Sequence, residues 1–167
     1  MLTALTLPYL GPSVQEPPSY CAYACAYAQI GWHVFPVEPW GKLPLPGSHG
    51  LLDATTDPAQ IARWWNENPW ANIGVNCGLS GLLVIDVDPR NGGLETLSAW
   101  VAEHGVLPTT LRARTPSGGF HAYFLLGDLP LPRKGRLGPG VDLQGAGAYV
   151  VVPPSQTLKG EYVWQTS

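Results

Sequence analysis

The stretch LLVIDVD, residues 82–88, decides how the rest of the chain is interpreted. Its apolar run predicts a buried β-strand, and the two acidic residues mark the end at which that strand emerges. Side chains alternate along a strand, so Asp86 and Asp88 are expected to point to the same side. Two neighbouring carboxylates repel each other unless a cation lies between them, and carboxylates with open coordination positions suit Mg²⁺ or Mn²⁺. A polar strand end facing solvent would explain the same pattern without a metal.

The segments before this strand predict helices alternating with short strands. Residues 1–19 contain four prolines and are expected to form an irregular lead-in to a single domain over residues 20–167. We expect a helix over 20–30, a strand over 32–38 and a long loop over 39–57. Asp57 followed by Pro58 is typical of a helix start, and residues 72–78 predict a further strand.

The segments after it predict one more helix and then mainly strands. Residues 91–93 open a helix whose Leu94, Leu97 and Val101 share one face. Strands are expected over 110–115, 120–126, 141–145, 148–155 and 161–165, with a loop rich in Pro, Gly and basic residues over 128–140. This order of elements indicates an α/β (α+β) fold in which helices pack on a mixed sheet.

Composition excludes several classes of protein. The chain has 167 residues, of which 45% are hydrophobic, so it can bury a core and is not disordered. No apolar window is long enough to span a membrane, and no secretory signal is apparent. The net charge is −3, with an acidic first part and a basic second part that would suit a site for metal ions and phosphates. Three cysteines without zinc-ligand spacing are expected to be apolar residues in a reducing cytoplasm.

A glycine-rich turn in the basic part is the second candidate for chemistry. Ser117, Gly118 and Gly119 precede His121, and successive backbone N–H groups in such a turn can bind an anion. His121 itself would bind phosphate or act as an acid or base, although a histidine hydrogen-bonded at the rim of a sheet is an equally simple interpretation. Arg112 and Arg114 alternate in the strand leading into the turn, so both are expected on one face, where they would clamp phosphates.

A third acidic residue, Asp142, lies between two apolar residues of a predicted strand. It would complete a three-carboxylate metal site with Asp86 and Asp88, or it is simply a solvent-facing residue. Lys42, in a proline-rich loop, is by itself most simply a surface lysine. The tryptophans at 64, 65, 70 and 100 are expected in the core rather than as platforms for bases.

Taken in order, these segments resemble one family, the bifunctional DNA primase/polymerase (prim-pol) domain of the archaeo-eukaryotic primase superfamily. The resemblance rests on D-x-D at 86–88, S-G-G-x-H at 117–121 and G-x-D-x-x-G-x-x-x-Y-V-V-x-P-P-S at 140–155, and it runs from about Tyr20 to Trp164. It implies that Asp86, Asp88 and Asp142 hold two divalent ions, Mg²⁺ or Mn²⁺, and that His121 contacts the phosphates of the incoming nucleotide. Where the family commonly has an arginine, this chain has Gln144.

The resemblance also implies a fold and a function. The expected fold is an N-terminal α/β unit packed on a C-terminal unit like an RNA-recognition sheet, with the active site between them. The expected activity is nucleotidyl transfer from NTP or dNTP to a 3′-hydroxyl on a single-stranded DNA template and primer, in plasmid or phage replication and in the cytoplasm. Arg133, Lys134 and Arg136 are candidates for template contacts. Relatives are commonly joined to a helicase, so the chain is expected to be part of a larger replication protein.

Three alternatives remain open at this point. A non-catalytic DNA-binding replication module would keep the fold without the activity. A different metal-dependent transferase would also carry D-x-D at a strand end, and a metal-dependent nuclease would use the same carboxylates. Metal binding and nucleotide incorporation on a primed template separate these possibilities.

Overall fold

The computed structural model describes residues 3–4, as backbone, and residues 19–165. Three α-helices form in this part of the chain: α1 (Tyr20–Gln29), α2 (Pro58–Glu67) and α3 (Gly93–His104). The strands are β1 (Thr3–Ala4), β2 (Val34–Val37), β3 (Asn72–Asn76), β4 (Leu82–Val87), β5 (Arg112–Arg114), β6 (Phe120–Leu125), β7 (Gly135–Gly138), β8 (Val141–Gln144), β9 (Tyr149–Val152), β10 (Gln156–Thr157), β11 (Gly160–Glu161) and β12 (Val163–Gln165).

These strands form one large sheet, one small sheet and a hairpin. The large sheet has the order β12-β5-β6-β4-β8-β7, with β1 also paired to β6. The small sheet has the order β2-β3-β9, and β10 pairs with β11. Every strand pair is antiparallel, so the mixed sheet expected from the sequence is wrong. Strands β4 and β5 are joined through α3, but β6 lies between them in the sheet and pairs antiparallel with both.

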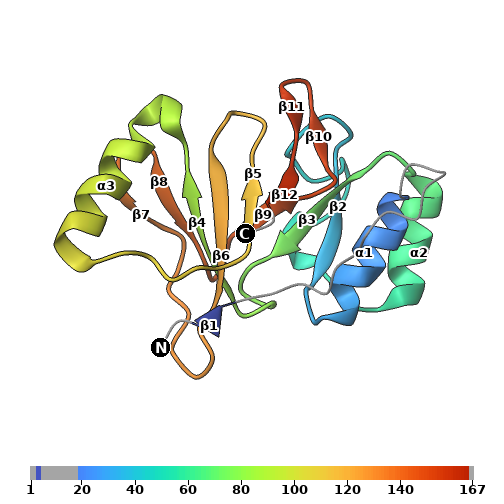
Figure 1. The fold of residues 1–167 in the computed structure, drawn as a ribbon. Helices are drawn as coiled ribbons and strands as arrows, with labels where there is room; N and C mark the ends of the chain where they lie inside the picture. Colours follow the sequence, from blue (N-terminus) through green and yellow to red (C-terminus); the bar gives the residue numbers. More distant parts are fainter. Residues whose placement is uncertain (1–2, 5–18, 166–167) are drawn as a thin grey trace.

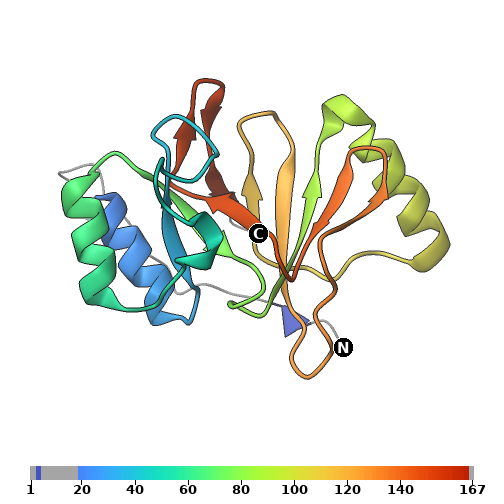
Figure 2. The same cartoon turned by 180° about the vertical axis from the view of Figure 1, so that it is seen from behind.

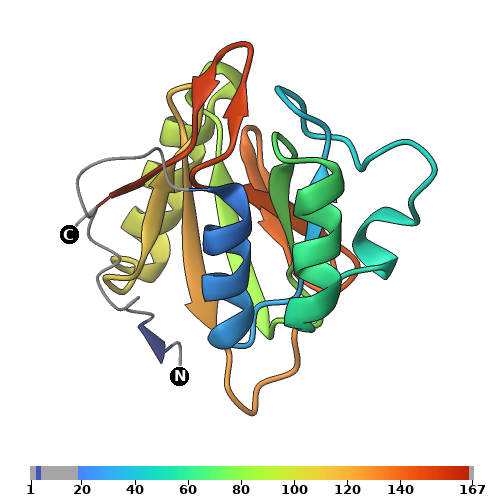
Figure 3. The same cartoon turned by 90° about the vertical axis from the view of Figure 1, so that its right-hand side faces the viewer.

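The helices cover different sheets (Figure 1). Helix α3 packs on one face of the large sheet, where Leu97 contacts a core that contains Ile85 and Phe124. The other face contributes Val84 and Tyr123 to a second core, which also includes side chains of α1, α2 and the small sheet. Figure 3 shows α1 and α2 side by side over that part of the molecule. Strand β4 is therefore buried on both faces until it reaches its acidic end.

Local signals explain the helix boundaries. The Asp57 carboxylate accepts a hydrogen bond from the Ala59 N–H and Pro58 opens α2, which confirms the predicted start. Ile61 and Trp65, four residues apart, form its buried face. In α3 the expected apolar face is only partly correct, because Leu94 is 52% exposed.

Two further expectations need correction. Part of the loop predicted over 128–140 is β7, whose glycines and arginine lack the apolar alternation that marks a strand. The irregular lead-in predicted over 1–19 lies mostly outside the described residues, but Thr3–Ala4 pair with β6. Within the described ranges, no helix combines the length and apolar character needed to cross a bilayer.

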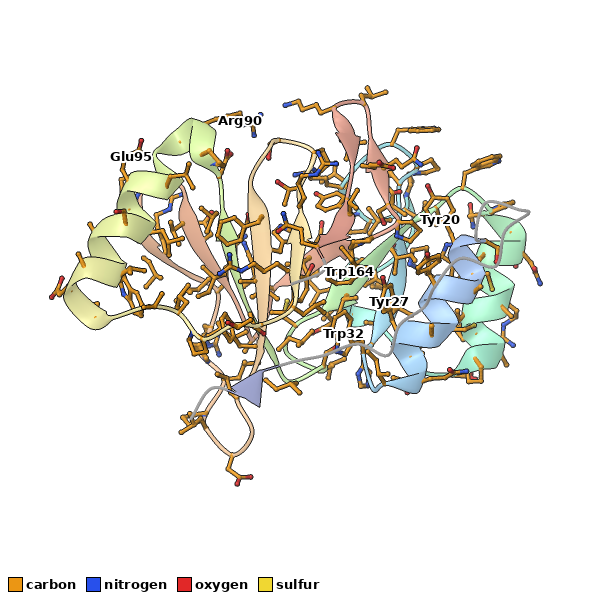
Figure 4. All side chains as sticks on the ribbon, viewed as in Figure 1. Tyr20, Tyr27, Trp32, Arg90, Glu95 and Trp164 are labelled. Atoms are coloured by element: carbon orange, nitrogen blue, oxygen red, sulfur yellow. The ribbon has the colours of Figure 1, made fainter. Side chains whose placement is uncertain are left out.

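A column of aromatic rings joins α1 to the large sheet. Trp32 stacks on Tyr27 of α1 and on Tyr123 of β6, with ring centroids 5.4 Å and 5.7 Å apart. Trp164 of β12 packs edge-on against Tyr123 and donates its indole N–H to the Tyr27 hydroxyl. Figure 4 shows Tyr27, Trp32 and Trp164 gathered between α1 and the large sheet, well apart from Arg90. The column fixes β6 in place up to His121, two residues from Tyr123.

Candidate active site

Three residues from three neighbouring strands stand in one row across the large sheet. Asp86 of β4 lies directly opposite His121 of β6 on one side and directly opposite Asp142 of β8 on the other. Residues paired in this way in antiparallel strands project from the same face, with their Cβ atoms about 5 Å apart. Chain segments that are distant in sequence thus place two carboxylates and an imidazole side by side.

Asp88 extends this row beyond the end of β4. Its carboxylate caps the short 3-10 helix Pro89–Asn91 by accepting the Arg90 backbone N–H. It also accepts two hydrogen bonds from the Arg90 guanidinium, at 3.1 and 3.0 Å, and one from the Asn91 amide. These bonds, above all those from the Arg90 side chain, lower the pKa of Asp88 below its usual range. Asp88 is consequently a carboxylate throughout the physiological range.

Glycines allow the chain to close around this end of β4. A Cβ at Gly119 would lie 2.0 Å from the carbonyl oxygen of Val87, so any side chain there would push the β5–β6 turn away from the strand. Gly140, at φ +67°, accepts a 2.7 Å hydrogen bond from the Asp88 N–H. These two close approaches hold the turn and the start of β8 against Asp88.

Asp142 has an arginine partner of its own. Arg136 of β7 lies opposite Asp142 in the register, and its Nε donates to Asp142 Oδ1 at 2.9 Å. Both side chains are partly exposed, so the pair is accessible to exchange with an ion from solvent. Two of the three carboxylates are therefore neutralised by guanidinium groups in this structure.

Both ring nitrogens of His121 have a polar neighbour, and the residue is only 5% exposed. Its Nδ1 lies 3.3 Å from the hydroxyl of Tyr123, and its Nε2 lies 3.5 Å from Asp86 Oδ1. An acceptor faces Nε2, which favours the tautomer with the proton on Nε2 and the Tyr123 hydroxyl donating to Nδ1. Burial raises the pKa of Tyr123, so its hydroxyl stays protonated. The ring is thereby oriented with Nε2 towards the carboxylates.

A cavity of about 390 Å³ opens over this row. All three carboxylates and His121 line it, together with three cationic side chains from separate segments. The lining residues are Lys42, Asp86, Asp88, Arg90, Asn91, Thr115, Ser117, His121, Arg136, Pro139, Gly140 and Asp142. A mixture of acids and cations in one hollow suits a ligand that brings both phosphates and divalent ions.

A second cavity, of about 280 Å³, adjoins the first through shared residues. Lys42, Asp86 and His121 line both. The second is less charged and is bounded by Gln144 and Tyr162. Burial, followed by the charge of Asp86, raises the pKa of Tyr162, so this ring presents a neutral hydroxyl. The two cavities meet at Asp86.

Comparison with known families decides the identity of the domain. The family model Prim-Pol, described as the N-terminal domain of bifunctional DNA primase/polymerase, matches residues 24–167. The chain belongs to the Prim-Pol family. This membership implies primase or polymerase activity in general terms, with DNA and nucleotides as substrates. No curated protein matches the chain in sequence.

The donor chemistry of the Prim-Pol cavity fits divalent ions such as Mg²⁺ or Mn²⁺. Asp86, Asp88 and Asp142 supply carboxylate oxygens in one hollow, and no thiolate competes there. Among the described residues, however, no three His, Cys, Asp or Glu side chains are already drawn together as a ligand cluster. Arg90 and Arg136 hold two of the carboxylates. A divalent ion at this site would therefore compete with these two guanidinium groups for carboxylate oxygens.

The structure does not bring every predicted phosphate-binding residue into the cavity. Ser117 lines it, but the Gly118 N–H is already donated to the Thr115 carbonyl within the turn. Arg112 and Arg114 lie on the opposite face of the sheet, and the Arg112 guanidinium lies 4.9 Å from the centre of the Phe120 ring. The register explains the error: Ala113 pairs with His121, so its two arginine neighbours point the other way.

Sequence reasoning missed the cations that do line the cavity. Lys42 looked like a surface lysine, and its loop is brought to the site by a hydrogen bond from the Tyr149 hydroxyl to the Lys42 carbonyl. Arg136 was assigned to template contacts rather than to Asp142. Arg90 was overlooked, although the sequence holds a signal for it. Asp88 followed by Pro89 repeats the helix-start pattern of Asp57 and Pro58. This pattern predicts that the Arg90 backbone N–H donates to the Asp88 carboxylate.

Proposed function

We propose that this domain is a DNA-dependent nucleotidyltransferase whose active site is the cavity around Asp86. The proposal rests on one observation: Asp86 is flanked in register by His121 and Asp142, within a cavity that also contains Asp88. Two carboxylates on adjacent strands and a third at the strand end are the donor set expected for catalysis with two divalent ions. The small sheet with α1 and α2, set against the large sheet with α3, supports a primase-like core with the site between its two units.

Asp86, Asp88 and Asp142 would hold Mg²⁺ or Mn²⁺, which supply charge that activates a 3′-hydroxyl and neutralises the leaving pyrophosphate. The other cavity residues would handle the nucleotide. Lys42, Arg90 and Arg136 offer cationic groups for the triphosphate. They come from three different segments, so they would surround the phosphates rather than contact them from one side.

His121 would orient the nucleotide through Nε2. Its ring is oriented by the Tyr123 hydroxyl, so its Nε2–H, which in this structure faces Asp86 Oδ1, would exchange that neighbour for a phosphate oxygen. The backbone N–H groups of Ser117 and Gly119 are further candidates, whereas that of Gly118 is used within the turn. Gln144 bounds the adjoining cavity as a neutral side chain, so the three cations of the first cavity would carry the charge that the family arginine commonly supplies.

The substrates would be NTP or dNTP and a single-stranded DNA template with a primer. Lys134 and Arg133 are exposed on the segment between β6 and β8, where they would contact the template backbone. A setting in plasmid or phage replication, with a helicase in the same full-length protein, is part of this proposal.

The test is an assay of labelled NTP or dNTP on single-stranded template, with and without primer, in Mg²⁺ or Mn²⁺. We expect primer extension by the wild type and none by Asp86→Ala. Asp128→Ala is the matched control, because Asp128 is an exposed acid in the loop after β6 and lies outside the cavity. Equal extension by wild type and Asp86→Ala would refute the assignment. Shortening of the template strand instead of extension would identify a nuclease.

A further inference from the structure

A groove of about 250 Å³ lies beside the active-site cavity and continues from it. We call it the Trp40 groove and define it by Trp40, Lys42, Arg90, Ser117, Leu158 and Lys159. Three of these residues, Lys42, Arg90 and Ser117, also line the active-site cavity. The remainder come from the loop after β2 and from the β10–β11 hairpin, which Figure 2 shows projecting at the same end of the molecule.

The groove is cationic and apolar at once. Lys42, Arg90 and Lys159 line it, and none of its lining residues is acidic. Leu158 at the tip of the hairpin is 91% exposed, and Trp40 is 51% exposed. Positive charge beside exposed apolar surface complements a ligand that carries phosphates and flat rings.

Trp40 is presented to solvent by an unusual backbone. Pro39 and Trp40 occupy the centre of a turn closed by a hydrogen bond from the Gly41 N–H to the Glu38 carbonyl. Trp40 has φ +60°, and every other described residue with positive φ is a glycine. A type II turn places glycine at this position because a Cβ is strained there. Within the described part of the chain, the Trp40 ring stacks on no other ring and its indole N–H has no hydrogen-bond partner. The folded core therefore gives no reason for a tryptophan at this position.

We propose that the Trp40 groove binds single-stranded DNA, with a base stacked on Trp40 and the backbone phosphates beside Lys159. This inference rests on the proposed function, because it names the path by which a template strand reaches the cavity. Aromatic side chains in a positively charged groove bind single strands irrespective of sequence, since every base has a flat face. In a duplex those faces are already stacked on neighbouring bases, so Trp40 would not reach them.

The test measures fluorescence anisotropy of a labelled oligodeoxythymidylate with the intact chain. We expect Trp40→Gly to bind about tenfold more weakly and Trp40→Phe to bind nearly as wild type. Glycine accepts φ +60° without strain, so Trp40→Gly should melt at or above the wild-type temperature, which separates lost binding from lost folding. Trp70→Ala is the matched control: Trp70 is 67% exposed and lies outside the groove.

Lys159 offers an independent readout. Lys159→Gln should reduce the slope of log affinity against log salt by about 0.7, the value for one phosphate contact on a single strand. A blunt duplex of the same length should respond to Trp40→Gly much less than the single strand does.

Unchanged oligonucleotide affinity in Trp40→Gly, or an equal loss in Trp70→Ala, would overturn the inference. So would an equal loss of affinity for the duplex. If the wild type extends a primer normally and Trp40→Gly still binds the oligonucleotide as tightly as the wild type, the groove is not the DNA-binding site but the proposed function stands. If binding depends on Trp40 but the wild type extends no primer, the groove stands as a DNA-binding site and the proposed function is wrong.

Discussion

Arg136 of β7 and Asp142 of β8 form an ion pair with 2.9 Å between Nε and Oδ1, and Asp142 lies directly opposite Asp86 of the next strand. The pair matters because Asp142 is one of the three carboxylates assigned to divalent ions. A guanidinium on one of these carboxylates balances its charge, and a metal ion must compete with it. The same guanidinium, once displaced, is free for a phosphate group in the cavity.

The first prediction follows from this exchange. Arg136→Gln should bind Mn²⁺ more tightly than wild type in the absence of nucleotide, by up to about fivefold, because a partly exposed ion pair is worth at most about 1 kcal/mol. The same variant should bind a Mn²⁺-nucleotide complex more weakly. Electron paramagnetic resonance of free Mn²⁺ measures the first quantity and calorimetry the second. Arg133→Gln, an exposed arginine of the same segment outside the cavity, should change neither. A parallel fall in both affinities would refute the exchange.

The second prediction concerns the orientation of His121. Tyr123→Phe removes the hydroxyl that contacts His121 Nδ1 at 3.3 Å while keeping the buried ring. We expect the KM for nucleotide to rise about fivefold with a smaller change in kcat, since one hydrogen bond of about 1 kcal/mol is lost. His121→Ala should raise the same KM more strongly, by about tenfold or more.

Steady-state incorporation on a primed template measures both variants. If His121→Ala leaves the nucleotide KM unchanged, His121 does not belong to the nucleotide site. If Tyr123→Phe lowers the melting temperature and kcat together without affecting KM, the hydroxyl serves the fold rather than the histidine.

The third prediction tests the face of the sheet. Arg112→Gln and Arg114→Gln should incorporate nucleotide within about twofold of wild type, because neither arginine lines the cavity. Their positions beside Ala113 place them on the face opposite His121. A large rise in the nucleotide KM for either variant would restore the phosphate clamp that the sequence suggested.

Much of the fold could be predicted from local signals. The buried run of β4 and the Asp57 cap of α2 were visible in sequence, because each is dictated by residues a few positions apart. Strand β7 was missed since its stability comes from pairing with β8 rather than from its own composition. The antiparallel order of the large sheet is likewise a property of contacts between distant segments.

The candidate site was predictable in its acids but not in its cations. The spacing of Asp86 and Asp88 and the motif around Asp142 can both be recognised in the sequence alone. Which face of β5 meets the cavity depends on register, and a shift of one residue exchanges Ala113 for an arginine. Arg136 reaches Asp142 only because β7 pairs with β8. Such relationships are set by tertiary structure.

The fourth prediction uses the cysteines. Burial raises the pKa of the Cys77 thiol to about 12, so at pH 8 this residue remains a protonated and inaccessible thiol. A raised pKa means less reactive thiolate at any given pH, and reactivity would increase only as the pH approaches 12. Iodoacetamide at pH 8 should therefore modify no more than Cys21 and Cys25 in the folded chain, and all three cysteines in denaturant. Intact mass spectrometry counts the adducts, and rapid modification of Cys77 in the native chain would contradict the described core.

The claim that Asp142 shares one site with Asp86 is tested most directly by the rate of nucleotide incorporation in Asp142→Asn. This change keeps the shape of the side chain, so the variant should melt close to wild type. We predict single-turnover extension at least about 100-fold slower than wild type, with the Asp128→Asn control unaffected. A folded Asp142→Asn protein that extends a primer at the wild-type rate would contradict the account.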